Sequence, residues 1–166
     1  MSLRLVTIGV YGFDREHFFQ ALVDAHIDVF CDLRARRGMR GSKYAFTNSR
    51  SLQQTLKELG IRYVHIKELA PGRILREVQR QQDKGLRVAK RARKVLGASF
   101  VHAYEQECLS LFDEQEFITQ LGPDAQVVGL FCVEREPEAC HRSLVAERLA
   151  KKLGVPVEHI LSQLNE

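Results

Sequence analysis

Short apolar runs alternate along the chain with segments whose apolar residues recur every three or four positions. The short runs are rich in β-branched and aromatic side chains, which predicts strands. Their near-continuous hydrophobicity is typical of parallel strands that are buried on both faces. We expect strands at residues 3–8, 27–33, 61–66, 126–133 and 155–161.

The segments with helical spacing lie between these strands, and their ends carry capping residues. Asp14 stands where a helix N-cap belongs, and Pro137 takes the first-turn position that proline favours. Gly60 and Gly154 follow the last apolar residues of their segments, as glycine does after a helix C-terminus. We expect helices at residues 14–25, 48–59 and 137–153.

This alternation predicts the α/β class, with a mostly parallel central sheet of about five strands flanked by helices. Residues 73–121 have helical patterning throughout and predict a helical insertion that breaks at Gly85 and Gly97. A length of 166 residues suits one domain, so we expect residues 1–166 to fold as a single α/β domain.

Composition favours a cytoplasmic protein without a membrane segment. No apolar run approaches the roughly 20 residues that span a bilayer, and the first residues lack the features of a signal peptide. The four cysteines form no C-x-x-C pair, which favours reduced thiols over a disulfide framework. The net charge of +4 permits an anionic partner. The oligomeric state and any cofactor stay open.

Ionisable side chains gather where the predicted strands end. Ligands of open parallel sheets bind at the carboxyl ends of the strands, so this edge is the candidate site. Because side chains alternate along a strand, residues two apart share a face. Such pairs, together with the start of the last helix, give the candidate residues Asp32, Arg34, Tyr63, His65, Cys132, Glu134, Cys140, His141 and Arg142.

Several chemistries fit these residues. Arg34 and Arg142 near a helix N-terminus predict an anion site, with Tyr63, Cys132 and Cys140 as further substrate contacts. Of the catalytic candidates, His65 and His141 would transfer protons, while Asp32 and Glu134 would orient a histidine or activate water.

Two further chemistries start from Cys140. Its place at a helix N-terminus beside His141 and Arg142 suggests a thiol with a lowered pKa and a nucleophilic role. A metal held by Cys132, Cys140, His141 or His65 is an alternative, but the spacing matches no standard zinc pattern, so we expect none. The common phosphate-binding glycine motifs are absent from the sequence.

The same residues carry a family resemblance. The segments Thr7–Gly12, Asp28–Arg34, Gly60–His65 and Phe131–Arg142, with the closing 157–160, resemble the family called domain of unknown function 488. The resemblance implies a compact α/β domain and marks the nine candidate residues as characteristic family positions. It implies no activity. The chain departs from the family pattern in the loops at residues 39–46 and 69–72.

Basic residues recur every three or four positions through the predicted insertion. Residues 73–94 contain nine Lys or Arg against Glu77 and Asp83, a local charge of +7. Such a stripe is either a solvated helix face or a phosphate-binding surface. The residues that we assign to nucleic-acid binding are Arg76, Arg80, Lys84, Arg87 and Arg91. No aromatic residues interleave them, so base stacking is not indicated.

Three functions follow from these patterns. The first is an enzyme, with a hydrolase as the reaction class, that acts on a phosphate-bearing substrate such as a nucleotide or nucleic acid. The second is a non-catalytic nucleic-acid-binding module that uses the basic stripe. The third is a thiol-dependent or sulfur-transfer enzyme that uses Cys140. The sequence alone does not choose the reaction or the substrate.

Overall fold

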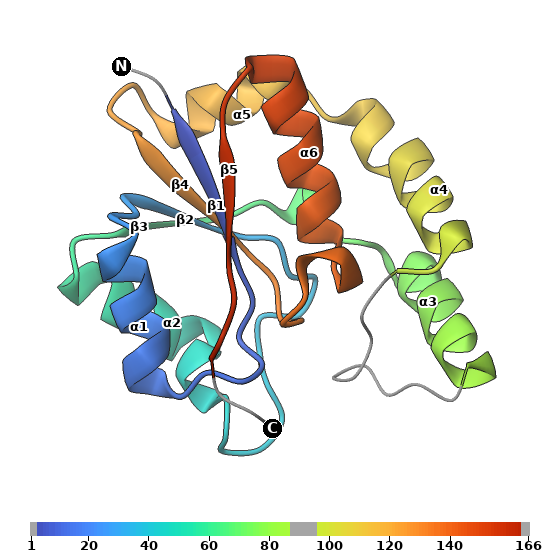
Figure 1. Cartoon of the computed structure of the whole chain (residues 1–166), viewed down its shortest axis with the longest axis horizontal. Coiled ribbons are helices and arrows are strands. Elements are labelled where there is room, and N and C mark those ends of the chain that lie inside the picture. The colour runs from blue at the N-terminus through green and yellow to red at the C-terminus, as the bar shows by residue number, and fades with distance from the viewer. Residues whose placement is uncertain (1–2, 87–95, 164–166) are drawn as a thin grey trace.

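A five-stranded, all-parallel sheet forms the centre of the protein (Figure 1). The computed structural model describes residues 3–86 and 96–163. The strand order is β3-β2-β4-β1-β5. The strands are β1 (Arg4–Ile8), β2 (Val29–Asp32), β3 (Arg62–His65), β4 (Val127–Phe131) and β5 (Val157–Ile160). Every predicted strand is present, and the α/β class is confirmed.

Helices cover both faces of the sheet (Figure 1). One face packs against α1 (Arg15–Asp24) and α2 (Ser49–Glu58). The other packs against α4 (Ala98–Glu107), α5 (Glu114–Leu121) and α6 (His141–Leu153). The helix α3 (Arg73–Gly85) packs against α4. In the part of the predicted insertion that the structure describes, α3 ends at Gly85 and α4 begins directly after Gly97, as expected, while residues 87–95 lie outside the described residues.

Alternation along the buried strands divides the core into two layers. Phe30 of β2 and Phe131 of β4 face α1, where Phe18 meets both of their rings edge-on, and the two strand rings are tilted against each other. Cys31 of β2 and Leu130 of β4 face the α6 side. Since both faces are apolar, the central strands have no polar alternation, which explains their continuous hydrophobic pattern.

The start of α6 differs from the sequence prediction. Pro137 opens a short 3₁₀ turn, Pro137–Ala139, and the α-helix begins only at His141. Cys140 between them has extended backbone angles, φ −136° and ψ 148°, which interrupt the helical hydrogen bonding. The predicted helix start at residue 137 is thus wrong, and the candidate side chains of this segment lie on two different backbone conformations.

The connections place a crevice beside β4. The chain leaves β2 toward α2 on one face, whereas it leaves the neighbouring β4 toward α6 on the other face (Figure 1). Neighbouring parallel strands whose connections diverge in this way leave an opening at their carboxyl ends. Within the described ranges, no helix combines the length and apolarity that crossing a bilayer requires.

Candidate functional site

A cavity of about 960 Å³ lies between the carboxyl ends of β2 and β4 and the helix α3. Its walls combine residues from two groups that are separate in the sequence, namely the strand-end candidates and the basic stripe. From the strand-end set, the residues that line it are Arg34, Cys132, Glu134, Cys140 and His141. From the basic stripe, they are Arg76, Arg80 and Lys84, joined by Arg73 and by Arg36 of the loop after β2. Arg87 and Arg91 lie outside the described residues.

Asp32 and Arg34 form a buried ion pair at the end of β2. The Arg34 Nε and Nη2 atoms donate to the two carboxylate oxygens at 2.9 and 2.8 Å, and the Tyr63 hydroxyl donates to Oδ2 at 2.7 Å. Asp32 is completely buried and does not line the cavity, so its carboxylate holds Arg34 in place. Residues two apart do share a face here, as alternation predicts.

Arg34 reaches the cavity from this pair. Its guanidinium lies 4.9 Å from the centre of the Phe131 ring, and Nη2 also donates to the Thr47 carbonyl at 2.8 Å. Its buried Nη1 has no hydrogen-bond partner among the described residues. Arg34 also lines the cavity, so its fixed guanidinium is a candidate donor to an anionic ligand.

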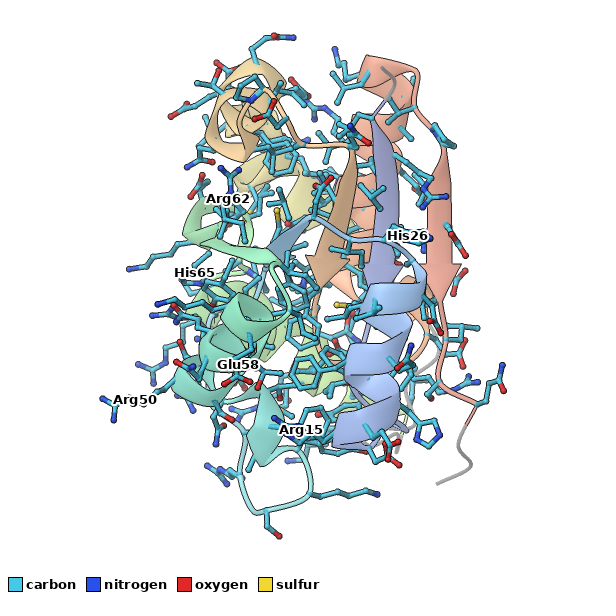
Figure 2. The ribbon with its side chains drawn as sticks, turned by 90° about the vertical axis from the view of Figure 1, so that its left-hand side faces the viewer. Arg15, His26, Arg50, Glu58, Arg62 and His65 are labelled. Atoms are coloured by element: carbon cyan, nitrogen blue, oxygen red, sulfur yellow. The ribbon has the colours of Figure 1, made fainter. Side chains whose placement is uncertain are left out.

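His65 and Tyr63 support the pair from β3. The His65 Nε2 lies 2.9 Å from the Arg34 carbonyl oxygen, and its place at the end of β3 is visible in Figure 2. The Arg37 guanidinium donates to the Tyr63 hydroxyl at 3.4 Å, and burial is the main reason why the pKa of Tyr63 rises to about 12. Neither side chain lines the cavity.

Arg142 is completely buried and contacts the backbone instead of the cavity. Its Nη1 donates to the Glu134 carbonyl, and its Nη2 donates to the Arg135 carbonyl at 2.9 Å. These bonds hold the segment after β4 in place and thereby orient Glu134, whose side chain is buried and lines the cavity. The geometry makes Arg142 a positioning residue for that segment.

Cys132, Cys140 and His141 meet at the buried floor of the cavity. Each sulfur lies 3.7 Å from the His141 Nδ1, and the ligating atoms of the three side chains all lie within 4.8 Å of one another. The His141 Nε2 lies 2.8 Å from the Leu33 carbonyl oxygen. Because that oxygen can only accept, Nε2 carries the hydrogen of the neutral imidazole, and in that form Nδ1 presents its lone pair to the sulfurs.

Burial and neighbouring groups together set the pKa values of Cys140 and His141. Burial raises the pKa of the Cys140 thiol to about 11, with a further contribution from the neighbouring Cys132. The lowered pKa expected from a helix N-terminus is therefore wrong, because Cys140 is shielded from water and precedes the helix. Burial lowers the pKa of His141, but Cys140, the Leu33 carbonyl and Glu134 outweigh it and raise that pKa above its ordinary value.

The spacing of the basic residues follows from the two faces of α3, one of which is buried while the other is exposed and lined with cations. Leu75, Gln79 and Asp83 recur every fourth position and are buried, and Gln79 donates to Asp83 at 2.7 Å. The cavity side carries four exposed cations, Arg73, Arg76, Arg80 and Lys84. Among them, Arg80 forms an exposed ion pair with Glu77.

Two contributors to the floor carry no sequence signal that could have identified them. The Leu33 carbonyl, which orients His141, is a backbone group. Tyr104 of α4 packs against the His141 ring with centroids 5.5 Å apart, and its hydroxyl donates to the Leu69 carbonyl at 2.6 Å. In the sequence, an aromatic residue on a helix cannot be distinguished from an ordinary core residue.

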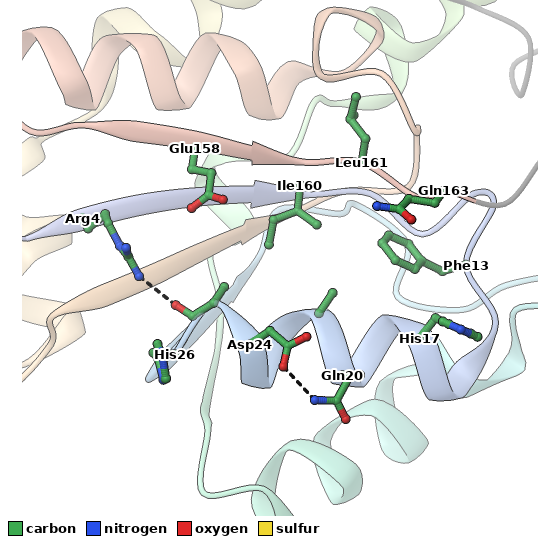
Figure 3. Close-up of a pocket in the computed structure, with 12 residues that line it drawn as sticks. Arg4, Phe13, His17, Gln20, Asp24, His26, Glu158, Ile160, Leu161 and Gln163 are labelled. Carbon is green, nitrogen blue, oxygen red and sulfur yellow. Dashed lines mark hydrogen bonds between the residues drawn. The ribbon is translucent and has the colours of Figure 1, made fainter.

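A second cavity, of about 780 Å³, lies between α1 and the edge strand β5 (Figure 3). Two of its polar residues form bonds across or along its wall. Arg4 donates to the Ala25 carbonyl at 2.9 Å, and Gln20 donates to Asp24 at 2.8 Å. The first cavity is the stronger candidate because it combines cations with thiols and an imidazole.

These features define a parallel α/β protein whose candidate site opens at the carboxyl ends of its central strands and combines cationic, thiol, imidazole and carboxylate groups. Within this class the chain belongs to the family described as domain of unknown function DUF488, whose sequence profile matches residues 14–149. The predicted family is thus confirmed. No curated protein and no solved structure gives a significant match to the chain.

Proposed function

We propose that the protein is an enzyme that acts on a phosphate-bearing substrate, a nucleotide or a short stretch of nucleic acid, bound in the cavity between α3 and the strand ends. The observation that carries this proposal is that cationic side chains and candidate catalytic side chains line the same cavity. Cations of α3 line one side, and Glu134 and His141 line the floor. Phosphate groups would contact α3 and Arg34, while Glu134 and His141 would face the reacting part of the substrate.

Charge supports an anionic ligand. Six cationic side chains line the cavity against three acidic ones, Glu77, Asp83 and Glu134, and Asp83 already accepts a hydrogen bond from Gln79. Arg34 adds a guanidinium that is held rigidly and is largely shielded from water, where charge-assisted hydrogen bonds are strong. The exposed arginines of α3 would attract negatively charged phosphate groups over a long range.

The binding half of the proposal is tested by reversing two charges on α3. The R76E/R80E protein should bind a short single-stranded oligonucleotide much more weakly than wild type. Two lost phosphate contacts should also reduce the slope of log affinity against log salt by about 1.4. The matched control is R50E/K57E on α2, which changes the same net charge at two exposed positions away from the cavity. Equal losses in both proteins, or no binding by wild type, would refute the cavity as the phosphate site.

The catalytic half is tested at Glu134. The E134Q protein should keep oligonucleotide and nucleotide binding but lose turnover by about 10²–10⁴-fold, the usual contribution of a general acid or base. Turnover is measured by chromatography of nucleotide and oligonucleotide products. If the wild type binds these ligands with the predicted salt dependence and yields no product, the protein is instead a non-catalytic binding module.

A further inference from the structure

The floor of the cavity has an arrangement that thiol and imidazole side chains adopt around a metal ion. Cys132 directly follows β4, Cys140 directly precedes α6, and His141 is the first residue of α6. All three are buried, and all three line the same cavity. None of the four cysteines is in a disulfide.

The orientation of His141 points to a cation between these groups. Its Nδ1 offers one lone pair, yet two sulfurs lie at the same 3.7 Å from it. One lone pair can accept only one S–H hydrogen in good geometry, whereas one cation can contact all three atoms at once. Donation from Nε2–H to a backbone carbonyl is also the usual way in which a metal-binding histidine is fixed.

The distances fit tetrahedral zinc. With zinc–sulfur bonds of about 2.3 Å and a zinc–nitrogen bond of about 2.0–2.1 Å, tetrahedral angles place sulfur and nitrogen about 3.6 Å apart and the two sulfurs about 3.8 Å apart. The observed sulfur–nitrogen distances are both 3.7 Å, and the whole set lies within 4.8 Å. Tetrahedral binding of one ion therefore requires the two sulfurs to approach each other by at most about 1 Å.

Charge balance also favours zinc at this buried place. Two thiolates neutralise the two charges of the ion, and the imidazole is neutral, so the loaded site carries no net charge. Binding releases the two thiol protons to solvent. Thiolate and imidazole ligands together suit zinc better than magnesium or calcium, which prefer oxygen.

We propose that Cys132, Cys140 and His141 bind one zinc ion whose fourth position opens to the cavity. Two cysteines and a histidine leave that position for water or substrate, as in catalytic zinc sites. Glu134 lines the same cavity and would face the open position. There the ion would acidify a bound water, and the carboxylate would accept its proton. The site stands on its own geometry and does not depend on the phosphate proposal.

Metal analysis of the full chain, purified without chelators and under reducing conditions, tests the site directly. We expect one zinc per chain. After replacement with Co²⁺, we expect thiolate-to-cobalt charge transfer and the intense visible absorption of tetrahedral cobalt. In competition with a chromophoric chelator, C132S and C140S should each weaken zinc binding by more than about 100-fold, because even lost outer contacts cost 10–100-fold. The C108S protein is the matched control and should retain wild-type affinity.

Zinc and cobalt binding by the wild-type protein tests the proposed site even if a cysteine variant folds poorly. Reduced wild-type protein that takes up no stoichiometric zinc or cobalt would overturn the proposal, as would a cobalt spectrum without thiolate bands. Zinc affinity that is unchanged in both C132S and C140S would do the same. Failure of the zinc site alone would leave the salt-dependent oligonucleotide binding of wild type and its loss in R76E/R80E intact, so the two proposals fail separately.

Discussion

The ion pair of Asp32 and Arg34 contributes both to the stability of the fold and to the candidate site. The buried carboxylate accepts hydrogen bonds from Nε and Nη2 of the Arg34 guanidinium and from the hydroxyl of the partly buried Tyr63. Its geometry leaves it no contact with the cavity. The catalytic role that the sequence suggests for Asp32 thus passes, in our proposal, to Glu134, while Asp32 fixes the arginine that meets the ligand.

Replacing Asp32 by asparagine should destabilise the fold. The change leaves the Arg34 charge buried without its counter-charge, and removing one partner of such a pair costs about 3–5 kcal/mol. Urea unfolding of D32N against wild type measures the loss. The control D124N changes the same residue type at an exposed position and should stay within about 0.5 kcal/mol of wild type. A loss for D32N as small as that for D124N would contradict the structural role.

At the scale of elements, the site depends on how closely the chain after β1 approaches the chain after β4. The amides of Val10 and Tyr11 both donate to the Val133 carbonyl, at 3.0 and 3.1 Å. Gly9 fits beneath this contact because it has no Cβ. A Cβ there would lie 1.8 Å from the Glu134 carbonyl oxygen and 3.1 Å from Nη1 of Arg142.

The substitution Gly9→Ala should therefore displace the segment that carries Glu134. Overpacking of this kind typically costs about 1–3 kcal/mol, and occasionally more. Thermal unfolding checks the stability, and zinc affinity reports whether the floor of the cavity has moved. The substitution Gly85→Ala is a control of opposite sign, because a Cβ there meets no atom within 4 Å and alanine favours the helix. Wild-type stability in the G9A protein would show that the two segments can separate freely.

The whole molecule should lose stability in alkaline solution because thiols are buried in its core. Burial of Cys31 within the sheet raises its pKa far above the ordinary value of about 8.5. Above that pH the unfolded chain loses the thiol proton, whereas the folded chain keeps it. The unfolded state then binds fewer protons, so the free energy of unfolding falls as pH rises, by up to about 1.4 kcal/mol per pH unit for each such group.

The variant Cys31→Val isolates this contribution, because valine fills a similar apolar space without an ionisable group. Urea unfolding of both proteins between pH 7 and 9.5 should give curves that separate above about pH 8.5, with the variant falling less steeply. Curves that stay parallel through this range would show that Cys31 keeps access to water in the folded state.

Local patterns determined most of the fold. The buried strands, the Asp14 cap and the breaks at Gly85 and Gly97 all follow from short-range rules, and the structure confirms them. The late start of α6 does not follow, because Pro137 suits a 3₁₀ turn as well as an α-helix. The extended backbone at Cys140 brings neighbouring side chains to one place, and no spacing rule predicts that.

The sequence by itself determined which residue types could carry chemistry and that those on the strands lie at one edge of a parallel sheet. Only the tertiary structure divided them between roles. Because Asp32 and Arg142 are buried, they position Arg34 and the segment after β4 instead of contacting the cavity. The helix α3 packs against α4 and thereby lies beside the strand ends. The Leu33 carbonyl directed His141 toward two sulfurs. These outcomes depend on contacts between distant segments and backbone atoms, and residue identity and spacing do not encode such contacts.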